Sequence, residues 1–427
     1  MPGLHAKGLD LIRPKHVLSA TMHPEPDTRH PIPEDTMSGN RQLVLFFAAI
    51  ACMACATGVH DSIFNNFLSD TFSLSPQARG LLEFPRETPG FLVFLTSGIL
   101  ATLPLMRVGT VATLVFSAGM LGLGLLGSNF WLMIAMMCIG STGLHLLQPV
   151  GATLAIGLSD ESNRGRRMGQ MGAVDTTAAV IGTGLVWLLL DKTAPQYRTG
   201  FVCAAILGAG AALMYSRMNV PHLHKARPRM VFRMRYRLYY LLELLAGARK
   251  QVFLTFGPWV LIKVYNEPAT SIAGLLMIAA LIGIVFKPMA GAMVDRFGER
   301  AVMIADGLVL ILVCIGYGYA IPLTGSIESA RLLACGCYVA DNLLFALSSA
   351  RAVYLSRVTA TPQELTSTLA MGVSINHIAS MTIPIGAGAL WAGFGYERVF
   401  LSAALVALLT SALALWVPAK GRYAPAR

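Results

Sequence analysis

Charged side chains are scarce in this sequence. Asp, Glu, Lys and Arg make up 13% of its 427 residues, while hydrophobic residues make up 55%. A soluble globular domain carries about 25% charged residues. The composition therefore excludes an ordinary soluble protein and predicts a protein embedded in a membrane.

Apolar runs long enough to cross a membrane recur along the chain. A spanning helix needs about 20 mostly apolar residues. Twelve such runs are centred near Ala49, Leu95, Thr113, Met136, Ala179, Ile206, Phe253, Ala280, Ile311, Ala340, Ala379 and Val406. They predict an all-α integral membrane protein of twelve transmembrane helices, with the lipid bilayer as its main partner and no separate soluble domain.

Several sequence motifs of enzymes and pumps are absent. The chain contains no G-x-x-x-x-G-K-[ST] phosphate-binding loop, no H-E-x-x-H and no G-x-S-x-G. The first would be needed by an ATP-driven pump, and the others mark metallopeptidases and serine hydrolases. We expect no enzymatic activity and no cofactor.

The first forty residues differ from the rest, being rich in proline and charge and without periodicity. No apolar core follows a basic start, so we expect no cleavable secretory signal. Residues 1–40 are predicted to form a disordered cytoplasmic tail.

The cysteines are few and odd in number. All seven lie inside apolar runs, which argues against a disulfide framework. Cys52 and Cys55 form a C-x-x-C, for which a metal or redox role is conceivable, but small packing residues in a membrane helix are the favoured interpretation.

The net charge of +11 is confined to alternate connections between the apolar runs. One side holds Arg164, Arg166, Arg167, Arg217, Lys225, Arg227, Arg229, Arg233, Arg235, Arg237, Lys420, Arg422 and Arg427. The other side holds only Arg79, Arg86, Lys192 and Arg198. This distribution obeys the positive-inside rule and places both termini in the cytoplasm. The excess charge thus sets topology, and we expect no nucleic-acid partner.

The two halves of the chain show weak internal similarity. The segment GVHDSIFNNF (58–67) aligns with GARKQVFLTF (247–256), and MRVG (106–109) aligns with DRFG (295–298) at the same offset. Such repeats are common in transporters. They predict two six-helix bundles, residues 41–216 and 236–419, with a basic linker at 217–235 and a cytoplasmic tail at 420–427.

The segment GAMVDRFGER (291–300) resembles the G-x-x-x-D-R-x-G-x-R/K signature of the major facilitator superfamily, through Gly291, Asp295, Arg296, Gly298 and Arg300. The resemblance implies two pseudo-symmetric six-helix bundles and transport by alternating access. It also implies that these residues form a cytoplasmic gate. In the first-half copy Met106 replaces the aspartate, and only Arg107 and Gly109 remain.

A fainter, general likeness links the chain to the major-facilitator proteins of bacterial magnetosomes, for which the resemblance implies iron transport. The G-P-x-x-G-G motif of drug–proton antiporters is absent from the fifth apolar run. This absence lowers the expectation of multidrug efflux.

Polar residues lie deep in the predicted helices. A charge in mid-membrane costs about 2.5–3.5 kcal/mol on insertion scales, so each should face a partner or a cavity. The candidates for substrate binding and proton coupling are His60, Asp61, His145, Gln148, Asp175, Arg249, Lys250, Lys287, Asp341, Asn342, Arg351 and His377. The repeat places Asp61 opposite Lys250, so we predict that Asp61 pairs with Arg249 or Lys250 across the halves.

Glu83, Arg86 and Glu87 cluster before the second predicted span. They are candidates for a periplasmic gate, and a solvated helix end explains the cluster equally well.

The sequence thus predicts a monomeric secondary transporter, with protons as the coupling ion, in a bacterial inner membrane or one derived from it. The excess of base favours an organic anion or a metal–anion complex as the substrate. A bare metal cation such as iron would use His60, Asp61, His145 and Asp341 instead. A sensor or assembly platform without net transport is the alternative from another class. No metal site and no direction of transport is assigned.

Overall fold

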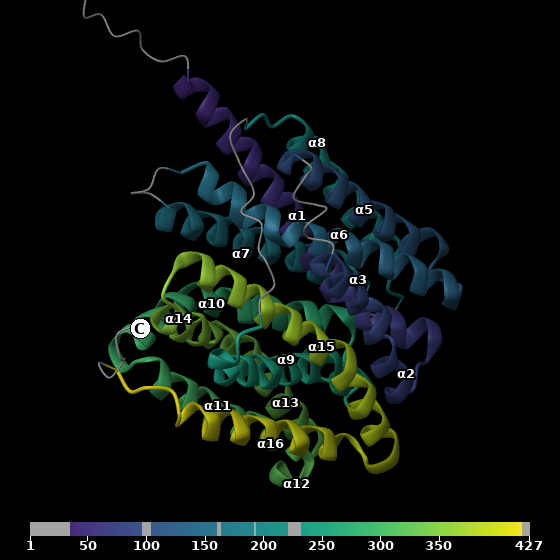
Figure 1. Ribbon diagram of the computed structural model, residues 1–427. Coiled ribbons are helices and arrows are strands. Elements are labelled where there is room, and N and C mark those ends of the chain that lie inside the picture. The colour runs from purple at the N-terminus through teal and green to yellow at the C-terminus, as the bar shows by residue number, and fades with distance from the viewer. Residues whose placement is uncertain (1–34, 96–103, 160–163, 192–193, 221–231, 421–427) are drawn as a thin grey trace, which may run out of the picture.

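The computed structural model describes residues 35–95, 104–159, 164–191, 194–220 and 232–420, and these residues are almost entirely helical (Figure 1). The helices are α1 (Asp35–Phe72), α2 (Pro76–Leu81), α3 (Glu83–Leu95), α5 (Leu105–Leu126), α6 (Phe130–Gly157), α7 (Arg164–Leu189), α8 (Tyr197–Ser216), η2 (Met234–Tyr236), α9 (Arg237–Lys263), α10 (Ala269–Phe297), α11 (Glu299–Gly318), α12 (Ala320–Thr324), α13 (Ile327–Leu344), η3 (Phe345–Ser348), α14 (Ser349–Val358), α15 (Pro362–Phe394) and α16 (Tyr396–Ala414).

Every predicted span centre falls in a helix, namely α1, α3, α5, α6, α7, α8, α9, α10, α11, α13, α15 and α16. Within the described residues, ten helices are long and apolar enough to cross a membrane, with α13 and α14 counted together. The other two are α3, whose described part has 13 residues, and α9, which carries Glu243, Arg249 and Lys250 in mid-helix. The all-helical membrane fold predicted from the sequence is confirmed.

Parts of the predicted domain division lie outside the described residues, namely residues 1–34 of the tail, 221–231 of the linker and the C-terminal 421–427. Helix α1 begins at Asp35, so the last residues assigned to the N-terminal tail are helical. Of the bases counted for topology, Lys192, Lys225, Arg227, Arg229, Arg422 and Arg427 also lie outside the described residues.

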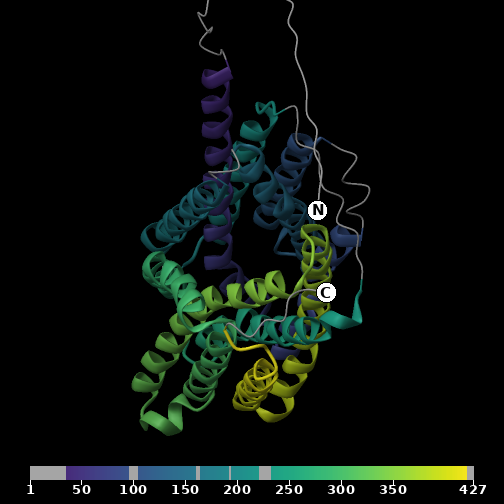
Figure 2. The same cartoon turned by 60° about the vertical axis from the view of Figure 1, so that its left-hand side comes forward.

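The helices form two groups, α1–α8 and α9–α16, which both views show as separate bundles (Figures 1 and 2). Within the first group α1 packs on α7 and α8, and α5 packs on α6 and α8. Between the groups, α2 and α3 pack on α15, and α7 packs on α10. These two seams hold the halves together.

The seam of α2 and α3 with α15 is very close at one end of the molecule, called here the α2 end. A Cβ added to Gly80 would lie 2.1 Å from the carbonyl oxygen of Pro384, and one added to Gly388 would lie 2.7 Å from that of Pro76. Glycine lets the two backbones touch. The opposite end, where α10 and α14 end, is called the α14 end.

Replacing Gly80 with alanine should therefore loosen the α2 end. The new methyl group collides with backbone, which cannot rotate away as a side chain can. Distance distributions between spin labels on α2 and α15 should broaden and lengthen. Gly386→Ala on α15 is the matched control, because nothing lies within 4 Å of its Cβ position. Equal distributions in the two variants would contradict this reading of the seam.

Candidate functional site

The candidate site includes a stripe of four charged residues on α2 and α3. Arg79, Arg86 and Glu87 each lie three or four residues from Glu83, so each is its neighbour on the surface of a helical segment. Nη1 of Arg79 lies 2.5 Å from Oε1 of Glu83. Nη2 of Arg86 lies 2.6 Å from Oε2 of Glu83 and 2.7 Å from Oε1 of Glu87. The two bases and two acids balance one another.

This stripe reaches across to the second half. Gln251 on α9 donates to Oε2 of Glu83 over 2.5 Å, and Nδ1 of His377 on α15 lies 3.2 Å from Oε2 of Glu87. Glu83 is completely buried and Glu87 is 4% exposed. The alternative that these acids form a solvated helix end is therefore wrong. The role of Glu83, Arg86 and Glu87 as a gate stays a prediction.

Two predicted histidines meet at Glu87. His145 on α6 and His377 have ring centroids 5.1 Å apart, and Nε2 of His145 lies 4.0 Å from Oε2 of Glu87. Both rings are buried. His145 lies about 22 Å along α6 and His377 about 22 Å along α15 at 1.5 Å per residue, which is near the middle of each helix.

The predicted pairing of Asp61 with Arg249 or Lys250 is wrong. Arg249 donates from Nη2 to Asp341 over 3.0 Å, inside the second half, and Lys250 donates to Oδ1 of Asn376 over 3.2 Å. The side chain of Asp61 is 65% exposed and lies 2.9 Å from Nδ1 of His60. The repeat aligns α1 with α9 along the sequence, but the buried carboxylate of Asp341 lies in the same bundle as Arg249 and satisfies it there.

Three bases surround a small cavity within the second half, called here the basic pocket. Its volume is about 120 Å³, and its lining includes Arg249, Lys250, Arg351 and a single acid, Asp306. Arg351 is bound to Glu243, with Nε 2.9 Å from Oε1. Among the described residues Lys250 has a neutral amide as its hydrogen-bond partner and no carboxylate within 4 Å. Among the residues that line the cavity, bases outnumber acids three to one, but Asp341 and Glu243 outside the lining pair with Arg249 and Arg351. Lys250 is therefore the base of this cavity that has no paired carboxylate.

A second cavity, of about 230 Å³, lies between the halves and is lined by residues of α1, α7, α10 and α13. It brings together three predicted residues, Asp61, Lys287 and Asn342. The ammonium of Lys287 donates a hydrogen bond to the hydroxyl of Thr176 over 3.1 Å. The bond goes to Thr176 and not to the neighbouring Asp175. Asp175 and Gln148 are exposed. The cation-binding set of His60, Asp61, His145 and Asp341 is not assembled: His60 contacts Asp61, but His145 contacts Ser141 and Glu87, and Asp341 pairs with Arg249.

The gate motif lies where the sequence predicts, between α10 and α11. Gly298 joins the two helices at φ +82°, a conformation that favours glycine. Asp295 and Arg296 are exposed, Arg300 is partly exposed, and Lys420 donates to the backbone carbonyls of Asp295 and Arg296. The buried acid here is Glu299, which Arg357 binds. Gly291 is exposed on α10, with open space at its Cβ position.

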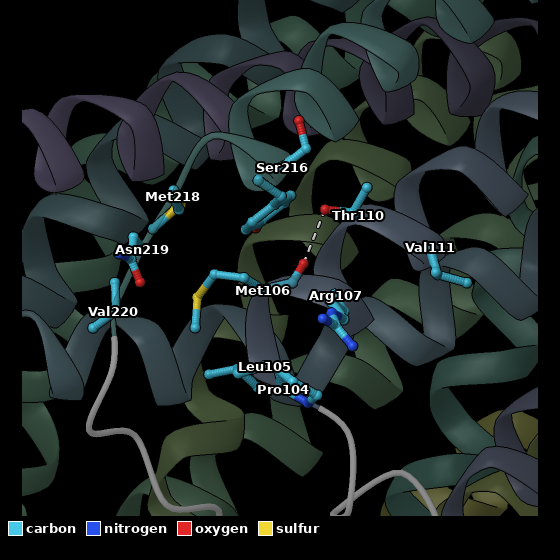
Figure 3. A pocket seen from close by; sticks show the side chains of 11 residues that line it. Pro104, Leu105, Met106, Arg107, Thr110, Val111, Ser216, Met218, Asn219 and Val220 are labelled. Atoms are coloured by element: carbon cyan, nitrogen blue, oxygen red, sulfur yellow. Dashed lines mark hydrogen bonds between the residues drawn. The ribbon is translucent and has the colours of Figure 1, made fainter.

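The first-half copy of the motif lies beside a cavity (Figure 3). Met106 and Arg107 line a cavity of about 560 Å³ between α5 and the end of α8. The one hydrogen bond drawn there runs from the hydroxyl of Thr110 to the carbonyl of Met106, over 2.9 Å. None of the described residues that line this cavity is acidic, so we assign it no part in ion pairing.

Sequence reasoning missed several partners of the charged residues. They are Arg79, Gln251, Glu243, Asp306 and the pair Glu299–Arg357. The spacing R-x-x-x-E-x-x-R-E at 79–87 is a signal that could have revealed Arg79 as a partner of Glu83. Gln251 has no such signal, because its partner lies 168 residues away.

The chain matches a known family of transporters. The family model of the Major Facilitator Superfamily matches residues 45–359. The chain belongs to the major facilitator superfamily. Its members are transporters and not enzymes, so the enzyme reading is excluded and this superfamily chain is a secondary transporter. No curated protein sequence matches it, and the fainter likeness to magnetosome proteins gains no support.

Solved structures of other superfamily members share this fold at low sequence identity. The nucleoside transporter NupG has a TM-score of 0.68 at 13% identity, over 88% of this chain and 98% of that one. An inward-facing, occupied bacterial homolog of the human lysosomal transporter Spinster gives 0.66 at 14%, over 91% and 97%. A D-xylose–proton symporter gives 0.64 at 16%, over 90% and 97%. At such identities the likeness shows the fold alone.

Proposed function

We propose that this superfamily transporter carries a small organic anion, or a metal–anion complex, through the basic pocket and couples it to protons. The observation that carries the proposal is the state of Lys250. Lys250 is partly buried, and an ammonium withdrawn from water is costly unless it is paired, yet its hydrogen-bond partner is the neutral amide of Asn376. An anionic substrate would supply the missing charge.

Arg249 and Asp341 provide a means of coupling. Their ion pair joins α9 to α13 and is buried on both sides. A substrate carboxylate that binds Arg249 displaces Asp341, and a carboxylate that loses its basic partner in a buried setting takes up a proton more readily. Binding of the anion and protonation of Asp341 would then occur together. This role replaces the one that we predicted for Asp61.

The distribution of bases supports one orientation of the chain. The α14 end carries Arg233, Arg235, Arg357 and Lys420, and by the positive-inside rule this favours a cytoplasmic α14 end. The close seam at the α2 end supports a cytoplasm-facing state in which Glu83, Arg86 and Glu87 seal the outer side.

Ligand-dependent thermal stability tests the anion assignment directly. A solute that binds the folded state raises stability by about 2.7 kcal/mol at 100 times its dissociation constant. Small mono- and dicarboxylates should raise the melting temperature of the purified transporter, and their amides of equal size should not. The effect should vanish in Lys250→Gln. Stabilisation by the amides, or by neither set, would count against the proposal.

Replacing Asp341 with asparagine should uncouple transport from protons. Asparagine keeps an acceptor for Arg249 but cannot take up a proton, so anion uptake should persist and stop responding to an imposed pH gradient. Uptake into proteoliposomes at several gradients measures this. Glu328→Gln, which changes an exposed carboxylate in the first turn of α13 outside the pocket, should keep the response of the parent. A pH response retained in Asp341→Asn would exclude Asp341 as the coupling group.

A further inference from the structure

Glu87, His145 and His377 place three metal-ligating side chains together near the middle of the molecule. One oxygen or nitrogen of each lies within 4.8 Å of those of the others, and all three residues are buried. They come from α3, α6 and α15, and α3 packs on both other helices (Figure 1). Within the described ranges, no other group of three such side chains is this close. The transport cycle proposed above gives the two histidines no role and uses Glu87 only in sealing the outer side.

The protonation of His145 leaves a site for a cation. Its Nδ1 lies 2.8 Å from the carbonyl oxygen of Ser141, which can only accept, so Nδ1 carries the hydrogen. The other nitrogen of a neutral ring, Nε2, then holds a lone pair. That lone pair lies 4.0 Å from Oε2 of Glu87, another acceptor. A positive ion between the two atoms would satisfy both.

The spacing suits a divalent transition metal. Zinc binds histidine nitrogen and carboxylate oxygen at about 2.0–2.2 Å, so two ligands of one ion lie about 3.0–3.5 Å apart. Here Oε2 of Glu87 lies 3.2 Å from Nδ1 of His377 and 4.0 Å from Nε2 of His145. A shift of less than about 1 Å brings both pairs into this range. Two imidazoles and one carboxylate are a donor set that such metals favour over magnesium.

The charges around Glu87 are compatible with a bound dication, but they do not favour tight binding. Oε1 of Glu87 is held by Arg86, which leaves Oε2 for the metal. Glu83 pairs with both Arg79 and Arg86. The two acids, Glu83 and Glu87, therefore balance these two bases. The ammonium of Lys250, bound to Asn376 next to His377, opposes a dication.

A glycine makes the convergence possible. A Cβ at Gly90 on α3 would lie 2.4 Å from Cδ2 of His145 and 2.7 Å from Cε1 of His377. Both rings therefore occupy space that any other residue would fill. Gly90→Ala should therefore displace both rings and perturb the site without removing a ligand.

We propose that Glu87, His145 and His377 bind a divalent transition-metal ion that bridges the two halves. Glu87 and His145 belong to the first half and His377 to the second. The halves must separate at the α2 end for the transporter to open there, and the bound ion must be released first. The ion thus acts as a clamp that inhibits transport, and it is not the cargo.

Metal binding to the purified full-length protein tests the site without any substrate. Titration with Co²⁺ should give ligand-field absorption that includes a component of this site, and Zn²⁺ should displace that Co²⁺ while Mg²⁺ should not. His377→Gln keeps a donor for Glu87, and it should weaken Co²⁺ binding at least about 10-fold, as should Gly90→Ala. The matched controls His60→Gln and Gly386→Ala should bind as the parent does. The remaining histidines, at positions 5, 16, 23, 30, 222 and 224, contribute equally in every variant.

The outcomes separate cleanly. Identical Co²⁺ titrations of the parent and His377→Gln would overturn the site. Zn²⁺ that inhibits uptake by the parent but not by His377→Gln would support the clamp, and Zn²⁺ that accumulates inside vesicles would overturn it in favour of a transported ion. Co²⁺ binding at the site in a protein that carries no anion would leave the site standing and refute the proposed substrate alone.

Discussion

Replacing Glu83 with alanine is expected to destabilise the folded transporter by about 3–5 kcal/mol, the cost of removing one partner from a buried ion pair. Glu83 is 0% exposed and accepts hydrogen bonds from Arg79, Arg86 and Gln251. Its loss leaves Arg79 with Asn65 and Arg86 with Glu87, while the net charge of the cluster rises by one. Both halves should be affected, because Gln251 belongs to α9.

The midpoint of denaturation in detergent measures this effect. Glu328→Ala is the matched control, since Glu328 is exposed in the first turn of α13 and its loss should change stability by less than about 0.5 kcal/mol. Glu83→Gln should fall between the two because an amide still accepts from arginine. Equal midpoints for Glu83→Ala and Glu328→Ala would show that the charge network does not hold the halves together.

Replacing Lys250 with methionine should reduce anion uptake without destabilising the folded transporter. Its partner is a neutral amide, so its removal leaves no unpaired charge and spares the cost of withdrawing an ammonium partly from water. Stability should stay unchanged or rise. Anion uptake should fall more than about 30-fold, because truncating one member of a buried charge pair costs about 2–5 kcal/mol of binding.

Lys263→Met is the matched control for this variant. Lys263 ends the same helix, is exposed, and lies over the ring of Trp259 at 5.2 Å. It should leave uptake at the parent level. A Lys250→Met protein that unfolds as readily as Glu83→Ala would assign Lys250 a structural role, and one that transports at the parent rate would remove it from the substrate site.

Composition and apolar run length were enough to predict an all-helical membrane fold with a helix at each predicted centre, and ten of the described helices are long and apolar enough to cross a membrane. The gate motif also lies at the predicted junction, because Gly298 must end one helix before Glu299 begins the next. These features depend on local chemistry, which a single sequence carries. The role of the motif in gating stays a prediction.

The partners of the buried charges could not be predicted in the same way. The repeat aligned Asp61 with Lys250, but the rotation of each helix about its axis decides which face turns inward, and the alignment does not contain it. Arg249 pairs with Asp341, which is 92 residues away in the sequence, and His377 contacts Glu87, which is 290 residues away. The exception is the stripe on α2 and α3, where helical spacing alone brings Arg79, Glu83, Arg86 and Glu87 together.

Uptake by proteoliposomes under an imposed pH gradient tests the central claim most directly. Vesicles containing the parent protein, Lys250→Met or no protein would be given small labelled carboxylates, ferric citrate, ferrous ion and neutral amides of equal size. The account predicts saturable uptake of carboxylate or of the citrate complex that grows with the pH gradient and is lost with Lys250. Saturable uptake of neutral solutes or of bare ferrous ion, with anions excluded, would contradict it.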